Sequence, residues 1–106
     1  MPQTRFMPAF TSLDELRRHQ LAGLQWTVSH AYEGSPEYRA KLEAAGIHPG
    51  DVQSLEDLRR LPFTTADDLR AGYPFPLRAV PFERIVRIHS SSGTTGRRKN
   101  LCYTRK

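Results

Sequence analysis

Prolines and glycines divide this chain into one long segment that can form a helix and several short segments. The 106-residue sequence contains eight prolines and seven glycines, and no proline lies between residues 9 and 35. Proline cannot continue a helix, and glycine often ends one. The pattern therefore predicts one long helix followed by short elements, within a chain long enough for at most one small domain.

The long segment carries start and stop signals for a helix over residues 12–33. Ser12 and Glu15 have the spacing of a capping box. Gly34 follows as a residue that tolerates the left-handed conformation at which many helices end. Apolar side chains recur along one side at helical spacing: Leu13, Leu16, Leu24, Val28 and Ala31.

Shorter helices are expected after residue 34. Pro36, directly after a capping Ser35, is typical of a first helical position, and Gly46 is expected to end that helix. Ser54 with Asp57, and Thr65 with Asp68, repeat the start signal for two brief helices. The aromatic residues of these segments and of the long helix are interpreted as packing contacts, within this chain or against a neighbouring domain or second subunit, and not as a stacking platform: Trp26, Tyr32, Phe63, Tyr73 and Phe75.

Two segments near the end of the sequence favour β-strands. Residues 85–89 are rich in β-branched side chains, and residues 100–104 form a second candidate strand. Because a short loop of small residues separates them, they predict an antiparallel hairpin. The expected fold class is α+β, with a mostly helical segment over residues 1–83 and a strand–loop–strand segment over residues 84–106.

Positive charge is concentrated in the second of these segments. Residues 1–83 contain nine Arg and Lys against eleven Asp and Glu, whereas residues 84–106 contain seven basic side chains and no acidic one. A local cationic field of this kind attracts a phosphate group or a polyanion. A solvated basic tail is the alternative interpretation.

The loop between the predicted strands has the residue types that phosphate binding requires. Glycines allow backbone N–H groups to converge on an anion, and Ser and Thr hydroxyls can donate to its oxygens. These residues are Ser91, Ser92, Gly93, Thr94, Thr95 and Gly96, with the cations Arg97, Arg98 and Lys99 directly after them. A flexible linker is the alternative, and neither the Walker spacing nor the dinucleotide-binding glycine pattern is present.

The loop resembles the phosphate loop of the adenylate-forming superfamily, which includes acyl-CoA synthetases. Its flanking segments resemble the amino-terminal part of phenylacetate–CoA ligases. The segments that carry this resemblance include 38–39, 54–58, 61–65, 73–75 and 86–89. Arg98 departs from the family pattern, because many relatives have a proline or another small or apolar residue at this position.

The resemblance implies an enzyme that uses Mg-ATP to convert an aryl acid, such as phenylacetate, into an acyl-adenylate. The acyl group is then transferred to CoA. It also implies that the hairpin begins a larger α/β domain, and that seven residues bind the β- and γ-phosphates of ATP: Ser91, Ser92, Gly93, Thr94, Thr95, Gly96 and Lys99. The catalytic residues are expected downstream, so this chain is not expected to catalyse ligation by itself.

The partners implied are the small-molecule substrates, the remainder of the ligase chain and, as a further option, a second copy in a homodimer. A basic module that binds nucleic acid or a protein partner is the alternative function, but only one aromatic residue, Tyr103, lies among the basic residues. A single cysteine, Cys102, excludes an internal disulfide and a cysteine-based zinc site. No metal site and no membrane span are expected, and a cytoplasmic location is predicted.

Overall fold

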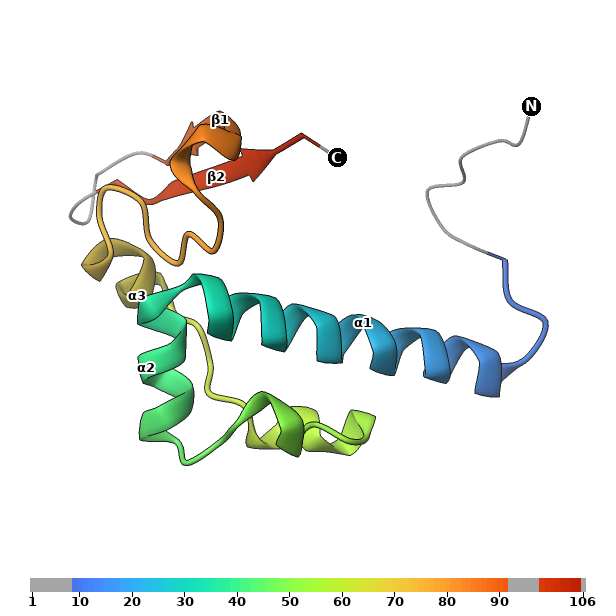
Figure 1. Cartoon of the computed structure of the whole chain (residues 1–106). Coiled ribbons are helices and arrows are strands. Elements are labelled where there is room, and N and C mark those ends of the chain that lie inside the picture. Colours follow the sequence, from blue (N-terminus) through green and yellow to red (C-terminus); the bar gives the residue numbers. More distant parts are fainter. Residues whose placement is uncertain (1–8, 92–97, 106) are drawn as a thin grey trace, which may run out of the picture.

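The computed structural model describes residues 9–91 and 98–105. A long helix α1 (Leu13–Gly34) is followed by four short helical elements: α2 (Pro36–Ala44), η1 (Pro49–Asp51), η2 (Leu55–Arg60) and α3 (Ala66–Ala71). A 3₁₀ turn η3 (Phe82–Arg84) then leads into the strands β1 (Ile85–Ser90) and β2 (Asn100–Thr104), which form a two-stranded sheet. Figure 1 shows α1 as the longest element, with the hairpin on the opposite side of it from η1 and η2. The predicted fold class, a mostly helical segment followed by an antiparallel hairpin, is confirmed.

The start of α1 differs in one detail from the predicted capping box. The Ser12 hydroxyl accepts a hydrogen bond from the Glu15 N–H at 3.1 Å, as expected for an N-cap. The Glu15 carboxylate, however, accepts from Thr11, at 2.8 Å from its N–H and 2.7 Å from its hydroxyl. The hydroxyl of Thr11, followed by its N–H, lowers the pKa of Glu15 below its ordinary value. The Glu15 carboxylate therefore accepts its hydrogen bonds from Thr11, whereas a capping box would have it accept from the N–H of the N-cap residue Ser12.

Gly34 is required for a reason that the sequence pattern did not predict. It is the last residue of α1 and is not among the described residues with a positive φ, which include Gly46 and Leu77. A Cβ added at Gly34 would lie 1.9 Å from the carbonyl oxygen of Ala79. The interpretation of Gly34 as a left-handed helix end is wrong; the glycine lets a distant part of the backbone approach the helix.

Gly46 fulfils the predicted role as the end of α2. Its φ is +70°, a conformation that glycine adopts without the steric cost that a Cβ brings. The Ile47 N–H then donates to the Leu42 carbonyl at 2.9 Å, which satisfies one of the helix's terminal carbonyls. This turn also buries the Ile47 side chain, so the glycine links a helix end to the core.

The core lies where α2 and the following turns pack against the second half of α1. Its buried apolar side chains are Val28, Leu42, Ile47 and Val52. Leu24, Tyr32, Tyr38 and Leu61 pack around them. The apolar side predicted for α1 is therefore buried at Val28 but not at Leu13, which is 60% exposed. In Figure 1 the first turns of α1 extend beyond the neighbouring elements, which explains this exposure.

Three of the five predicted packing aromatics lie on the surface. Tyr32 packs against the core, but Trp26 is 66%, Phe63 is 89% and Tyr73 is 45% exposed. Trp26 stacks on His30, one helical turn further along α1, with ring centroids 4.7 Å apart. These three side chains therefore do not pack in the core of this chain, and their contact with a neighbouring domain or a second subunit stays a prediction.

A carboxylate joins α3 to α2. Lys41 Nζ lies 2.6 Å from Asp68 Oδ2 and also donates to the Phe63 carbonyl at 2.6 Å. The same Asp68 oxygen accepts from the Thr65 N–H at 2.8 Å, while the Thr65 hydroxyl accepts from the Asp68 N–H, which completes the predicted capping box. The hydrogen bond from Lys41, followed by that from Thr65, lowers the pKa of Asp68.

The hairpin contains a bulge that its sequence did not reveal. Ile85 pairs with Thr104 and Arg87 with Tyr103, so Val86 is the extra residue between two consecutive pairs. Large apolar side chains on the hairpin remain exposed to between 44% and 57%: Val86, Ile88, Leu101 and Tyr103. The described residues thus leave these four side chains of the hairpin largely uncovered.

Replacing Gly34 by alanine should destabilise the fold, because the new methyl group would overlap the Ala79 carbonyl. We expect a loss of about 1–3 kcal/mol in the free energy of unfolding. Gly23→Ala is the matched control: no atom lies within 4 Å of the position that its new methyl group would take, and replacing a helical glycine should add roughly 0.5–1 kcal/mol. Urea unfolding followed by circular dichroism measures both. Equal stability of the two variants would contradict the close approach at Gly34.

The lowered pKa of Asp68 predicts an acid-sensitive fold. A carboxylate whose pKa is lower in the folded state stabilises that state above its unfolded-state pKa, which is about 4. The contribution is lost as the pH falls through the folded-state pKa. We therefore expect the free energy of unfolding to decline below about pH 4, and Asp68→Asn to weaken this decline.

Asp67→Asn provides the control for this pH dependence, because the Asp67 side chain is 92% exposed. Thermal unfolding of the three proteins across the acid range measures the effect. The same acid dependence in wild type and in Asp68→Asn would show that the bond between α2 and α3 does not respond to protonation.

Candidate functional site

The candidate site lies at the end of the hairpin, where β1 stops and β2 begins. Beyond Ser90 the two strands are joined by one more pair of hydrogen bonds. The Ser91 N–H donates to the Lys99 carbonyl at 2.9 Å, and the Lys99 N–H donates to the Ser91 hydroxyl at 3.2 Å. These bonds close the base of the loop that the sequence predicts to bind phosphate.

Of the seven predicted phosphate-binding residues, the structure describes two. Ser91 and Lys99 face each other across the loop base. The other five, Ser92, Gly93, Thr94, Thr95 and Gly96, lie outside the described residues, as does Arg97. The Ser91 hydroxyl oxygen accepts the bond from Lys99, so its own hydrogen can be donated to an anion above the loop base.

A shallow depression of about 330 Å³ adjoins this loop base. Its lining residues are His89, Ser90, Ser91, Lys99 and Leu101. The His89 ring packs against Tyr103, with centroids 4.8 Å apart. The depression therefore offers hydroxyl groups and one cationic side chain beside an apolar wall.

The basic side chains of the hairpin have no acidic partners within the described part of the chain. Its ion pairs join residues 39–70 to one another. Basic residues on and beside the strands are Arg84, Arg87, Arg98, Lys99 and Arg105. Since no carboxylate neutralises them, the positive field predicted from the sequence lies around the loop base.

One polar contact near the site was not predicted from the sequence. Asn100, the first residue of β2, donates from its Nδ2 to the Pro74 carbonyl at 2.7 Å. Pro74 follows a cis peptide bond and lies in the proline-rich stretch before the hairpin. An asparagine at the start of a strand does not indicate which distant residue its side chain will contact, so this hydrogen bond could be identified only from the folded structure.

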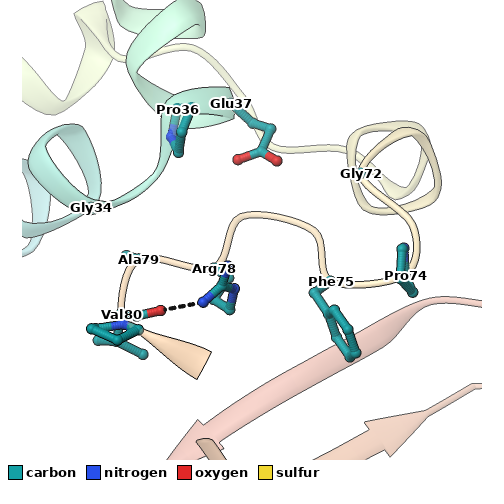
Figure 2. A pocket seen from close by; sticks show the side chains of 10 residues that line it. Gly34, Pro36, Glu37, Gly72, Pro74, Phe75, Arg78, Ala79 and Val80 are labelled. Atoms are coloured by element: carbon teal, nitrogen blue, oxygen red, sulfur yellow. Dashed lines mark hydrogen bonds between the residues drawn. The ribbon is translucent and has the colours of Figure 1, made fainter. Parts of the chain in front are cut away.

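A larger hollow, of about 570 Å³, lies between the start of α2 and the segment 72–81. Figure 2 shows Glu37 on one side and Arg78 on the other, with Phe75 pointing towards the hairpin. Arg78 does not extend freely into this space, because its Nη1 donates to the Val80 carbonyl at 2.8 Å. This hydrogen bond therefore joins Arg78 to the backbone of its own segment.

The described residues offer no protein site for a metal ion, since no three His, Cys, Asp or Glu side chains among them are grouped to hold one. None of the helices described combines the length and the apolar character needed to cross a membrane.

The sequence is similar to those of several curated ligases. It is 55% identical over 93 residues to the phenylacetate–coenzyme A ligase of Escherichia coli K12, covering 88% of this chain and 21% of that protein. It is 53% identical over 95 residues to the enzyme of the same name from Aromatoleum evansii, covering 90% and 22% respectively. The chain thus spans about a fifth of the length of these relatives. No family model matches it.

Solved structures of another CoA ligase share the fold. The structure of a 2-hydroxyisobutyryl-CoA ligase in complex with 2-HIB-AMP and CoA matches with a TM-score of 0.78 and 36% identity, over 90% of this chain and 21% of that one. An open conformation of the same ligase matches with a TM-score of 0.74 and 30% identity, over 94% and 26%. The resemblance recognised in the sequence is confirmed by both comparisons.

Proposed function

From its resemblance to phenylacetate–coenzyme A ligases, we propose that this sequence is part of an ATP-dependent acid–CoA ligase acting on an aryl acid such as phenylacetate. The observation that carries the proposal is the 55% identity over 93 residues, a stretch that makes up 88% of the chain. The hairpin geometry supports it, because a loop closed at its base by Ser91 and Lys99 presents a fixed anchor for phosphate-binding groups.

The loop would bind the β- and γ-phosphates of ATP. In the first step, a carboxylate oxygen of the acid attacks the α-phosphorus, an acyl-adenylate forms and pyrophosphate leaves. Ser91, Ser92, Gly93, Thr94, Thr95, Gly96 and Lys99 are the residues proposed to hold the departing pyrophosphate. Orienting this group and neutralising its charge lowers the barrier to its departure.

The remaining chemistry would come from outside the described residues. Mg²⁺ would be bound through the ATP phosphates and would reduce their charge. The CoA thiol would then attack the acyl carbon, which releases AMP and forms the thioester. We assign residues 84–106 to the start of a large adenylation domain and residues 1–83 to a helical segment that supports it. We expect the complete enzyme to act in the cytoplasm.

The remainder of a ligase chain is the proposed main partner of this segment. Four large apolar side chains of the hairpin are exposed to between 44% and 57%, which suits a surface that further strands or helices cover. Because the chain spans about a fifth of its relatives, we do not expect these 106 residues alone to catalyse ligation. A homodimer of the complete enzyme is compatible with this arrangement.

Gly93→Val should abolish most of the first half-reaction. A β-branched side chain cannot easily adopt a positive φ, and it would occupy space meant for phosphate oxygens. The test uses a chimera in which this sequence replaces the matching segment of the Escherichia coli relative. Acid-dependent exchange of pyrophosphate into ATP should fall steeply in Gly93→Val and stay near the wild-type level in Gly23→Ala. Wild-type exchange in Gly93→Val would show that the loop does not bind phosphate.

The 106-residue chain itself should bind tripolyphosphate weakly. Its unopposed basic side chains attract the anion, but ordering the loop costs ~1–2 kcal/mol for each backbone residue fixed. We expect a Kd no tighter than roughly 1 mM, and weaker binding as salt screens the charges. ATP should compete equally well, because no adenine contact is expected. NMR titration that follows the amides of residues 91–99 measures this; salt-resistant micromolar binding with a preference for ATP would contradict it.

A further inference from the structure

The two strands of the hairpin make few direct contacts with the helices of this chain. Among the described elements, the extensive contacts are between the two strands and between α1 and α2, η1 or η2. Neither strand makes comparable contact with a helix. The position of the hairpin relative to the helices therefore depends on the connecting segment 72–84 and on individual interactions.

One of these interactions lies directly beside the loop base. Asn100 follows Lys99, whose backbone closes the loop against Ser91, and its Nδ2 donates to the Pro74 carbonyl at 2.7 Å. The two residues are 26 positions apart in the sequence. This bond consequently joins the exit of the loop to a different part of the chain.

The acceptor side of this bond is held rigidly. Gly72 and Gly34 both allow close backbone approach: a Cβ would lie 2.7 Å from Pro76 Cα at the first and 1.9 Å from the Ala79 oxygen at the second. Arg78 bonds to the Val80 carbonyl within the same segment. Figure 2 shows this stretch running between the start of α2 and the strands, with Pro74 and Phe75 nearest the strands. Pro74 therefore belongs to a segment that packs closely against the helical part of the chain.

We infer that Asn100 is a positioning residue for the phosphate loop, because it ties the exit of the loop to the Pro74 carbonyl. The inference rests on the proposed function. Without this bond the loop exit would occupy several positions, and only a fraction of the molecules would be ready to bind the ATP phosphates. Apparent affinity falls in proportion to that fraction. Once ATP is bound, the loop is held in the same place, so the rate of the chemical step is preserved.

The test measures acid-dependent pyrophosphate exchange in the same chimera. Asn100→Leu keeps the approximate size of the side chain and removes the donor; Asn100→Asp removes the donor and keeps the shape. Asn100→Leu should raise the KM for ATP by about 3- to 10-fold, the effect of losing one hydrogen bond. Asn100→Asp should raise it at least as much, because its carboxylate also repels the Pro74 carbonyl and the ATP phosphates. The kcat and the KM for the acid should change less than about twofold, since the bound state is unchanged. Asn100→Gln, which retains an amide donor, should recover most of the affinity.

Thr104→Leu is the matched control, because it makes a similar change on the same strand at the end away from the loop. It should leave the KM for ATP unchanged, and thermal unfolding should be similar in all variants. An unchanged KM for ATP in Asn100→Leu, equal values for the Leu and Gln variants, or a parallel fall in kcat and thermal stability would each overturn the positioning role alone. A wild-type chimera without exchange activity would instead overturn the proposed function, and this inference with it.

Discussion

The close approach of the backbone at Ala79 to Gly34 is the constraint on which the arrangement of this chain depends. The core of the helical segment does not involve this contact, because Val28, Leu42, Ile47 and Val52 pack together among α1, α2 and the turns that follow. This contact brings the proline-rich stretch directly against the end of α1. That stretch carries Pro74, and the hairpin is tied to Pro74. Because glycine has no side chain, residue 34 lets the segment that carries Pro74 pack against α1, and through Asn100 this segment helps to position the start of β2.

Much of the fold could be predicted from the sequence because its signals are local. Ser12, Ser35 and Thr65 each cap a helix at the predicted position, and Gly46 ends one through its own backbone conformation. Composition also identified the two strands. What was missed depends on contacts between distant segments: the reason for Gly34, the exposure of Trp26 and Phe63, and the bulge at Val86. No local pattern contains that information.

In the candidate site, too, the features set by local sequence could be predicted, and the contacts between distant segments could not. The loop and the concentration of positive charge were evident from residue types alone, and the structure adds the closing bonds between Ser91 and Lys99. The five central loop residues lie outside the described part of the chain, so their proposed role rests on the sequence and on the resemblance to phenylacetate–coenzyme A ligases. Asn100 could not have been chosen from the sequence, because its importance arises from a carbonyl 26 residues away.

The open edges of the hairpin have a consequence for how this chain behaves in a concentrated solution. Each strand leaves one row of backbone N–H and C=O groups without a partner strand in the described structure, next to exposed Val86, Ile88, Leu101 and Tyr103. Such edges are templates for intermolecular β-pairing and aggregation. Arg87 lies within β1, and Lys99 and Arg105 flank β2. When two hairpins align, these like charges repel each other, so the basic residues around the proposed phosphate site would also oppose self-association.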